Sequence, residues 1–271
     1  MGATTKIDWC DSSWNPVTGC LHGCEYCYAR GIANRFGLPY APKLGDPGME
    51  GAKKYDSSEG MDTMLELVKP YEKNGRKRPY PMGFLPTFHR YKLEEPQHWR
   101  KPRSIFVCSM ADLFGEWVPD EWIKAVFDAC AEAPQHRYLF LTKNPSRYMQ
   151  LYRKDIVLPP TIEWWYGYTI DGLQDVPHDA PFGNHTFVSV EPIQRRLTPM
   201  MLNDIVRARW IIVGAETGNR KGRVIPEKSW IDEILWRAHA KWMTPVFMKE
   251  SLRTLMGDDF QQEFPWKEDE K

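Results

Sequence analysis

The sequence predicts an α/β fold in which parallel strands alternate with helices, either as a partial barrel of six strands or as a near-complete (βα) barrel of eight. From residue 104 onward, short and continuous apolar runs recur, as expected for strands buried on both faces of a parallel sheet. Helical segments with start signals lie between these runs, and polar residues follow each run directly. Such alternation implies consecutive βαβ units, hence a barrel or a doubly wound sheet.

The predicted strands are the apolar runs, each of four or five residues. They are Ile105–Cys108, Tyr138–Leu141, Trp164–Tyr168, Thr186–Val190, Trp210–Val213 and Pro245–Met248. Two further strands are expected upstream, one at Met82–Leu85 and one before Cys20, and with them the expected number reaches eight.

The predicted helices begin where a capping residue or a proline precedes an apolar stripe, because proline lacks the donor that a first helical turn leaves unpaired. Thr198-Pro199 is one such start signal. The predicted helices are Glu121–Glu132, Ser146–Tyr152, Met200–Ala208 and Glu227–Trp242.

Residues 1–271 are expected to form one barrel domain, with residues 37–80 as an insertion or lid within it. That segment is rich in Gly, Pro, Lys and Asp, and it shows little strand pattern, although Met61–Val68 suggests a short amphipathic helix. Long excursions of this kind are often lids or binding elements.

Composition limits the function classes. A chain of 271 residues with a formal net charge of zero can bury a large core, and its overall charge gives no reason to expect nucleic-acid binding. Local basic patches remain open. The N-terminus has no apolar leader, and no apolar run approaches membrane-spanning length. We therefore expect a cytoplasmic protein without a membrane partner, in which thiols stay reduced.

Polar residues follow the apolar runs at the ends where the active site of a (βα) barrel lies. The candidates for catalysis are His89, Lys143, Glu191 and Glu216, and Asp112 also follows a run. Burying a lysine or a carboxylate at a barrel mouth is unfavourable without a partner or a ligand, which favours a site there. Loops are polar by default, so the alternative for each residue is an ordinary strand-to-loop transition.

Three cysteines near the N-terminus carry the strongest chemical signal. Cys20, Cys24 and Cys27 have the spacing C-x3-C-x2-C, with the aromatic Tyr26 before the last cysteine. Three thiolates can hold three irons of a four-iron cluster and leave the fourth iron open for chemistry. Two alternatives remain: a zinc site completed by His22 or a distant cysteine, and inert buried thiols.

This spacing with its aromatic residue resembles the signature loop of the radical S-adenosylmethionine (SAM) superfamily. The resemblance implies a [4Fe-4S] cluster on Cys20, Cys24 and Cys27, with SAM at the open iron. It also implies an external electron donor, reductive cleavage of SAM and abstraction of a substrate hydrogen, chemistry that the cofactors supply. The cysteine loop would then follow the first barrel strand, with Tyr26 near the adenine.

A second resemblance extends over nearly the whole chain. Several segments together look like a phage- and mobile-element-associated three-cysteine family of unassigned function, which implies a radical-SAM-like barrel. They are Thr5–Trp9, Trp14–Cys20, Cys24–Ala29, Phe106–Phe114, Leu141–Pro145, Val188–Pro192 and Ile212–Gly218. The similarity to spore photoproduct lyase, a radical SAM barrel that repairs DNA, is more distant.

One departure from the superfamily concerns the SAM contact. Many members place Gly-Gly-Glu after the second strand, whereas this chain offers Thr87 and His89 as the polar residues there. Either side chain is a candidate replacement. The resemblance further implies that Ser109, Asp112 or Lys143 contacts the ribose or carboxylate of SAM.

The substrate is less constrained. Basic residues gather at Lys73–Arg78, His89–Lys92 and His98–Arg103, the last two groups interleaved with aromatic residues. Such groups can track a phosphate backbone and stack bases, which predicts a DNA or RNA substrate, although solvated surface loops have the same composition. The alternatives are a small molecule or peptide enclosed by aromatic residues at Trp164–Tyr168, and a non-catalytic zinc or iron–sulfur module that binds nucleic acid.

Overall fold

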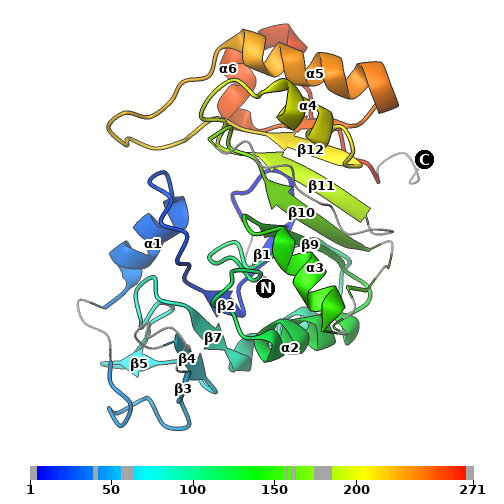
Figure 1. The fold of residues 1–271 in the computed structure, drawn as a ribbon. Coiled ribbons are helices and arrows are strands. Elements are labelled where there is room, and N and C mark those ends of the chain that lie inside the picture. The colour runs from blue at the N-terminus through cyan, green and yellow to red at the C-terminus, as the bar shows by residue number, and fades with distance from the viewer. Residues whose placement is uncertain are drawn as a thin grey trace. The chain divides into compact units, whose positions relative to one another are not determined.

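The fold is α/β (Figure 1). Its main sheet has seven strands, in an order that follows the chain. A computed structural model describes residues 5–38, 42–55, 64–154, 156, 158–159, 161, 163–173 and 185–266. The sheet order is β1 (Ser12–Trp14), β8 (Ser104–Val107), β9 (Arg137–Thr142), β10 (Trp164–Thr169), β11 (His185–Val190), β12 (Trp210–Val213) and β13 (Val246–Met248). Consecutive parallel strands with helical crossovers are the topology of a partial (βα) barrel. The predicted fold class is therefore confirmed, with seven strands in this sheet among the described residues.

The chain divides into two compact units. The first is built around Cys10–Phe140, and the second joins Lys6–Trp9 to the residues from Leu141 onward. In the first unit β1 pairs with β8, and β8 pairs with β9, in parallel. In the second unit β10, β11, β12 and β13 pair in parallel, each with the next.

The core of the first unit forms where helix α2 (Asp120–Ala131) buries its apolar stripe. Trp122, Val126 and Cys130 on this stripe are fully buried. The rings of Phe127 and Phe140 lie 5.4 Å apart and meet edge to face, a favourable aromatic geometry. Acidic residues in the first turn of α2 complement the helix dipole. This helix, its stripe and strand β8 confirm the sequence predictions.

The second unit carries the regular βα pattern predicted from its apolar runs. Helices α3 (Ser146–Arg153), α4 (Pro199–Ile205) and α5 (Lys228–Trp242) connect its strands. The Thr198 hydroxyl accepts a hydrogen bond from the amide of Met201 at 3.3 Å, which confirms the predicted cap of α4. Short helix α6 (Arg253–Met256) follows β13.

The segment Lys6–Trp9 belongs to the second unit although it precedes the first in sequence. Trp9 is 1% exposed, and its ring lies 6.1 Å from that of Phe187 and 6.2 Å from that of Trp210. The amide of Glu250 donates a hydrogen bond to the carboxylate of Asp8 at 2.8 Å. An early segment thus completes the core of the later unit.

The insertion holds more regular structure than its composition predicted. A second sheet has the order β2 (Val17–Thr18), β7 (Thr87–His89), β4 (Met64–Leu67) and β3 (Lys53–Tyr55). A separate hairpin pairs β5 (Glu72–Lys73) with β6 (Arg76–Lys77). A small apolar cluster supports these elements: Met49, Leu65, Leu67, Tyr71 and Met82. The prediction of little strand structure in residues 37–80 is wrong; their role as a lid stays a prediction.

Two local predictions in this region are wrong for physical reasons. The helix expected at Met61–Val68 is strand β4 where the structure describes it, while residues 61–63 lie outside the described residues. Its spacing suggested a polar helical face because Glu66 interrupts the apolar residues, but Glu66 is buried in an ion pair. The strand expected at Met82–Leu85 is a turn, closed by a hydrogen bond from the amide of Leu85 to the carbonyl of Met82.

Helix α1 (Tyr28–Phe36) follows the cysteine loop in the first unit. It buries Ala29 and Ala33 against Met110, a residue of the segment after β8. Within the described ranges, no helix is both long and apolar enough to cross a bilayer.

Candidate metal and cofactor site

The cysteine loop begins at Gly19, a position where the backbone conformation and the lack of space both require glycine. Gly19 has a φ of +87°, and a Cβ atom there would lie 2.2 Å from the carbonyl oxygen of Leu85. The amide of Gly19 donates to the carbonyl of Met110 at 2.9 Å, and the amide of Cys20 donates to the carbonyl of Phe84 at 3.1 Å. Two other backbone segments therefore hold the start of the loop, which fixes the position of Cys20.

The loop ends at the start of helix α1. Cys27 caps this helix, and its sulfur accepts a hydrogen bond from the amide of Arg30 at 3.4 Å. The amide of Cys27 also bonds the carbonyl of Cys24 at 3.3 Å, which closes the turn between the two cysteines. The N-terminus of a helix favours negative charge, so this position suits a thiolate. All three cysteines of the loop are partly exposed, within reach of a cofactor.

Burial raises the pKa of the Cys20 thiol from 9.0 to about 12, and the nearby Asp112 carboxylate adds to the rise. Cys24 and Cys27 also contribute, because three negative sulfurs gathered in one loop repel each other. Without metal, Cys20 is therefore a protonated thiol at neutral pH. A bound cluster would supply the positive charge that favours three thiolates and would release the proton.

The chemistry of the donor set fits an iron–sulfur cluster. Three partly exposed cysteines lie within one loop of eight residues. Soft thiolates are the usual ligands of such clusters, and each cysteine of a four-iron cluster binds a separate iron.

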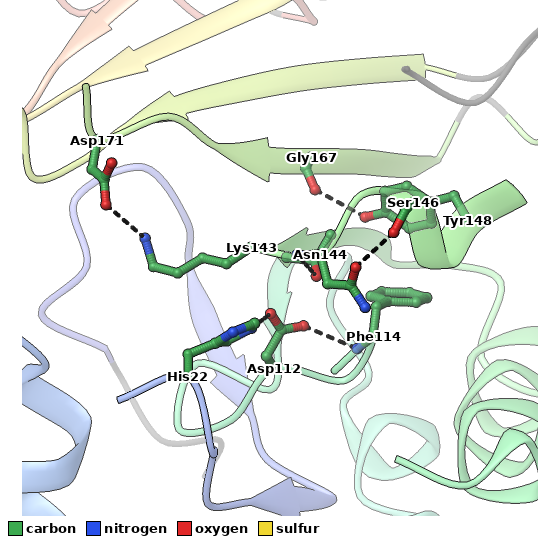
Figure 2. A network of polar contacts seen from close by, with 10 residues as sticks. His22, Asp112, Phe114, Lys143, Asn144, Ser146, Tyr148, Gly167 and Asp171 are labelled. Carbon is green, nitrogen blue, oxygen red and sulfur yellow. Dashed lines mark hydrogen bonds and ion pairs between the residues drawn. The ribbon is translucent and has the colours of Figure 1, made fainter. Parts of the chain in front are cut away.

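A hydrogen bond that the sequence analysis missed tethers the cysteine loop. His22, the candidate fourth ligand of a zinc site, places Nε2 2.7 Å from Oδ2 of Asp112 (Figure 2). The other oxygen of Asp112 accepts a hydrogen bond from the amide of Phe114 at 3.0 Å. The His22 ring lies 4.9 Å from the ring of Trp117. Both carboxylate oxygens of Asp112 are thus hydrogen-bonded within the protein. Asp112, a predicted SAM contact, therefore positions the cysteine loop in this structure.

The segment after β8 is fixed beside the cysteine loop. The side-chain oxygen of Asn15 accepts hydrogen bonds from the hydroxyl of Ser109 at 3.2 Å and from the amide of Met110 at 2.9 Å. The Tyr28 hydroxyl donates to the carbonyl of Ser109 at 2.7 Å. Cys108, just before, has a φ of +60°, which turns the chain sharply at the end of the strand. Predicted residues Ser109 and Asp112 therefore lie in the same unit as the three cysteines.

Thr87 and His89 lie in the second sheet, not at the end of a barrel strand. The Thr87 hydroxyl donates to the carbonyl of Leu85 at 3.0 Å. His89 is fully buried, with Nε2 2.8 Å from the hydroxyl of Thr18 and Nδ1 3.1 Å from that of Tyr91. Burial lowers the pKa of His89 well below 6.5, so its ring is neutral at pH 7. The strand that was to present both residues to SAM is absent from the described chain, and their polar atoms tie the second sheet together.

In the second unit, charged residues after the strands form two pairs. Nζ of Lys143, after β9, lies 3.9 Å from Oδ2 of Asp171, after β10 (Figure 2). Glu191, after β11, forms an ion pair with Lys249, after β13. A Cβ atom on Gly214, after β12, would lie 2.9 Å from Cδ of Lys249 and 3.3 Å from Cγ of Glu191. Glycine at this strand end leaves the room that the second pair occupies.

Glu216 is held by a two-point ion pair. Nε of Arg220 lies 2.6 Å from one carboxylate oxygen, and Nη2 lies 2.8 Å from the other. Gln194 donates a third hydrogen bond at 3.3 Å. These donors, Arg220 above all, lower the pKa of Glu216 below its ordinary value of 4.5. An ionised carboxylate cannot donate a proton at neutral pH, so Glu216 does not suit a role as a general acid. Its bonds to Arg220 and Gln194 instead hold the loop after β12.

Replacing Glu216 by glutamine is expected to lower the free energy of unfolding by about 1–3 kcal/mol near neutral pH. Because the pKa of Glu216 is lower in the folded state, its contribution is present above pH 4.5 and is lost as the pH falls through the lower folded value. The deficit should therefore shrink in acid, as urea unfolding across pH can measure. The control is Glu233→Gln, which breaks a more exposed pair with Arg196. A constant deficit at all pH values would contradict the assignment.

Taken together, the strand order and helical crossovers define an α/β protein with a partial radical-SAM-type (βα) barrel. A solved spore photoproduct lyase mutant matches this fold with a TM-score of 0.50 and 10% identity, over 92% of this chain and 79% of that chain. Residues 4–251 match the family described as a protein of unknown function, DUF5131. The chain belongs to this family.

Two other lyase structures are less similar. A mutant with dinucleoside spore photoproduct has a TM-score of 0.44 and 10% identity, and covers 88% of this chain. A mutant with bound AdoMet and dinucleoside spore photoproduct has a TM-score of 0.43 and 11% identity, with the same coverage. This chain spans 63% of the length of each of these two lyase chains. No curated protein matches the sequence. The phage association predicted from the segments stays a prediction.

Proposed function

We propose that this protein is a radical SAM enzyme, in which Cys20, Cys24 and Cys27 hold a [4Fe-4S] cluster. The observation that carries the proposal is the placement of the cysteine loop: it follows β1 of the seven-stranded sheet and β2 of the second sheet and leads into helix α1, with Cys27 at the helix N-terminus. When bound, the cluster and SAM supply one-electron cleavage of the sulfonium and a radical that abstracts hydrogen from substrate.

The chain's own residues would bind and orient. Three thiolates would hold three irons and leave one coordination position for SAM. The His22–Asp112 hydrogen bond would keep the loop at one angle, since it joins the loop to the segment after β8. Tyr26, in the turn between the last two cysteines, remains the proposed neighbour of the adenine.

Roles in the second unit are assigned by strand position. Lys143 remains a proposed SAM contact and a catalytic candidate, because it directly follows strand β9, its amine lies 3.9 Å from Oδ2 of Asp171, and its side chain is partly exposed. Glu191 remains a catalytic candidate, and it forms an ion pair with Lys249. Glu216 ranks lower, since Arg220 already occupies both of its oxygens. His89, which lies in the first unit, ranks lower still because it is fully buried.

We propose nucleic acid as the substrate class, with an external electron donor. Local clusters of cationic side chains support this proposal, because they can contact phosphates. The chain as a whole has no net charge, so any attraction to a polyanion must come from such clusters. The fold likeness to spore photoproduct lyase is consistent with it, but at 10% identity the likeness concerns the fold.

The test is anaerobic iron–sulfur reconstitution followed by electron paramagnetic resonance of the reduced protein, with and without SAM. A four-iron signal that changes on adding SAM is the expected result. A four-iron signal indifferent to SAM would contradict SAM chemistry, and retention of zinc without iron would contradict the cluster. Cys10→Ala is the matched control, because Cys10 is a partly exposed cysteine outside the loop and its replacement should leave the signal intact.

A further inference from the structure

The β5–β6 hairpin is the most strongly charged element of the insertion. Between Lys69 and Arg78 the sequence has five cations and a single carboxylate, in a chain whose formal net charge is zero. The two strands are joined by Asn74 and Gly75, which have φ values of +53° and +68°. Two consecutive left-handed residues make the tight turn that matches the twist of a β-hairpin, so the tip has a defined conformation.

Two cations on this hairpin lie where they repel one another. Lys73 is directly opposite Arg76 in the strand pairing, and like charges at opposed positions destabilise a sheet, whereas Lys77 is opposite Glu72. Arg76 and Lys77 are both exposed to solvent. An exposed pair of like charges is suited to an anionic partner that offsets their repulsion.

The base of the hairpin is anchored in the insertion's apolar cluster. Tyr71, just before β5, is 6% exposed, and its carbonyl accepts a hydrogen bond from the amide of Arg78 at 2.9 Å. A Cβ atom on Gly48 would lie 3.3 Å from both the Tyr71 ring and the carbonyl of Glu72, so the chain packs closely there. A fixed base presents the cations with less entropy to lose on binding.

One cation in each of the other two predicted basic groups is used inside the protein. Nε of Arg90 lies 2.6 Å from the buried carboxylate of Glu66, and its guanidinium lies over the ring of Phe88. Arg103 donates to the hydroxyl of Ser12 at 2.9 Å and lies over the ring of Trp99. Arg90 and Arg103 thus stabilise the fold, whereas Arg100 and Lys101, like Arg76 and Lys77 on the hairpin, are exposed.

We propose that the β5–β6 hairpin contacts the phosphate backbone of a nucleic-acid partner. The choice of nucleic acid as the partner rests on the proposed function, and the location of the contact on this hairpin goes beyond it. A two-stranded ribbon can enter the major groove of a duplex, and exposed Arg76 and Lys77 can reach phosphates on either side. No aromatic residue lies on β5, β6 or their turn, so base stacking plays no part in this contact.

The test is fluorescence anisotropy of labelled oligonucleotides, duplex and single-stranded, with the reconstituted full-length protein across a salt series. The variant Arg76→Gln/Lys77→Gln should bind about tenfold or more weakly at low salt, and its salt slope should fall by about 2, since each lost phosphate contact removes about 0.9. The control Lys124→Gln/Lys228→Gln removes the same charge from cations paired with Asp128 and Asp232. Its affinity should change less than about threefold.

Equal losses in both variants would overturn the proposal, because bulk charge would then explain them. Binding by the parent protein to anionic vesicles but to neither oligonucleotide would also overturn it. SAM cleavage without nucleic acid is measured in parallel on the parent and on the Arg76→Gln/Lys77→Gln variant, and it should be equal in the two. Absent SAM cleavage with hairpin-dependent binding would contradict the proposed enzyme and leave the contact standing. Intact SAM cleavage without hairpin-dependent binding would support the proposed enzyme and overturn the hairpin contact.

Discussion

Replacing Cys24 by alanine is expected to abolish SAM cleavage while the protein stays folded. Two thiolates cannot retain a four-iron cluster with an open iron, so iron content and the SAM-dependent signal should both fall to background. Cys24 is partly exposed and lies in a turn outside the apolar clusters, so the free energy of unfolding should change by less than about 1 kcal/mol. The measurements are iron content, formation of 5′-deoxyadenosine and urea unfolding of the metal-free protein.

The outcome separates a catalytic cluster from a structural metal. Global unfolding of the Cys24→Ala variant would show that a metal holds the fold together, as in small zinc domains. An undiminished SAM-dependent signal would show that other ligands hold the cluster. Cys10→Ala serves as the control, since it removes a partly exposed thiol outside the loop.

Replacing Gly19 by alanine is expected to lower the free energy of unfolding by about 3 kcal/mol or more. The added Cβ atom would lie 2.2 Å from the carbonyl oxygen of Leu85, which is backbone and cannot rotate away. The left-handed φ of +87° adds conformational strain. The loop would have to lift, breaking the 2.9 Å hydrogen bond from Gly19 to Met110, so cluster assembly should fall as well. Urea unfolding and iron content measure the two effects.

The chain offers a matched control three residues past the first cysteine. Gly23 also has a left-handed φ, of +73°, but a Cβ atom there would meet nothing within 4 Å. Gly23→Ala should therefore show the conformational strain alone, about 1–2 kcal/mol. Equal destabilisation by the two substitutions would mean that the close approach at Gly19 has no energetic consequence.

The fold could be predicted well from residue 104 onward because strands buried on both faces leave continuous apolar runs. Trp210–Val213 is such a run, and all four of its residues are buried. The insertion could not be predicted in the same way. Strand β4 carries Glu66 in its interior, and a buried carboxylate reads as a solvent-facing residue until its partners, Arg90 and Tyr55, are known. Pairings across tens of residues leave no local pattern.

In the candidate site, too, local features could be predicted from the sequence, whereas contacts between distant residues could not. The cysteine loop was predictable because its spacing lies within eight residues and the chemistry demands thiols. The hydrogen bond between His22 and Asp112 was not, since the two residues are separated by 90 positions and meet only when the segment after β8 reaches the loop. The signal that could have found it is weak: a histidine inside the motif and an acidic residue after a strand. The burial of His89 likewise depends on Thr18 and Tyr91.

The placement of Lys6–Trp9 in the second unit has a consequence for the order in which the protein folds during synthesis. Asp8 and Glu250 are separated by 242 positions, so at about 5–20 residues per second the early segment waits roughly 10–50 s for its partner to be made. Phe187 and Trp210 are made earlier than Glu250, but until they are made they cannot cover the ring of Trp9. The second unit can therefore reach its final packing only after translation is nearly complete, and before Phe187 and Trp210 emerge the nascent chain presents an apolar residue that chaperones can bind.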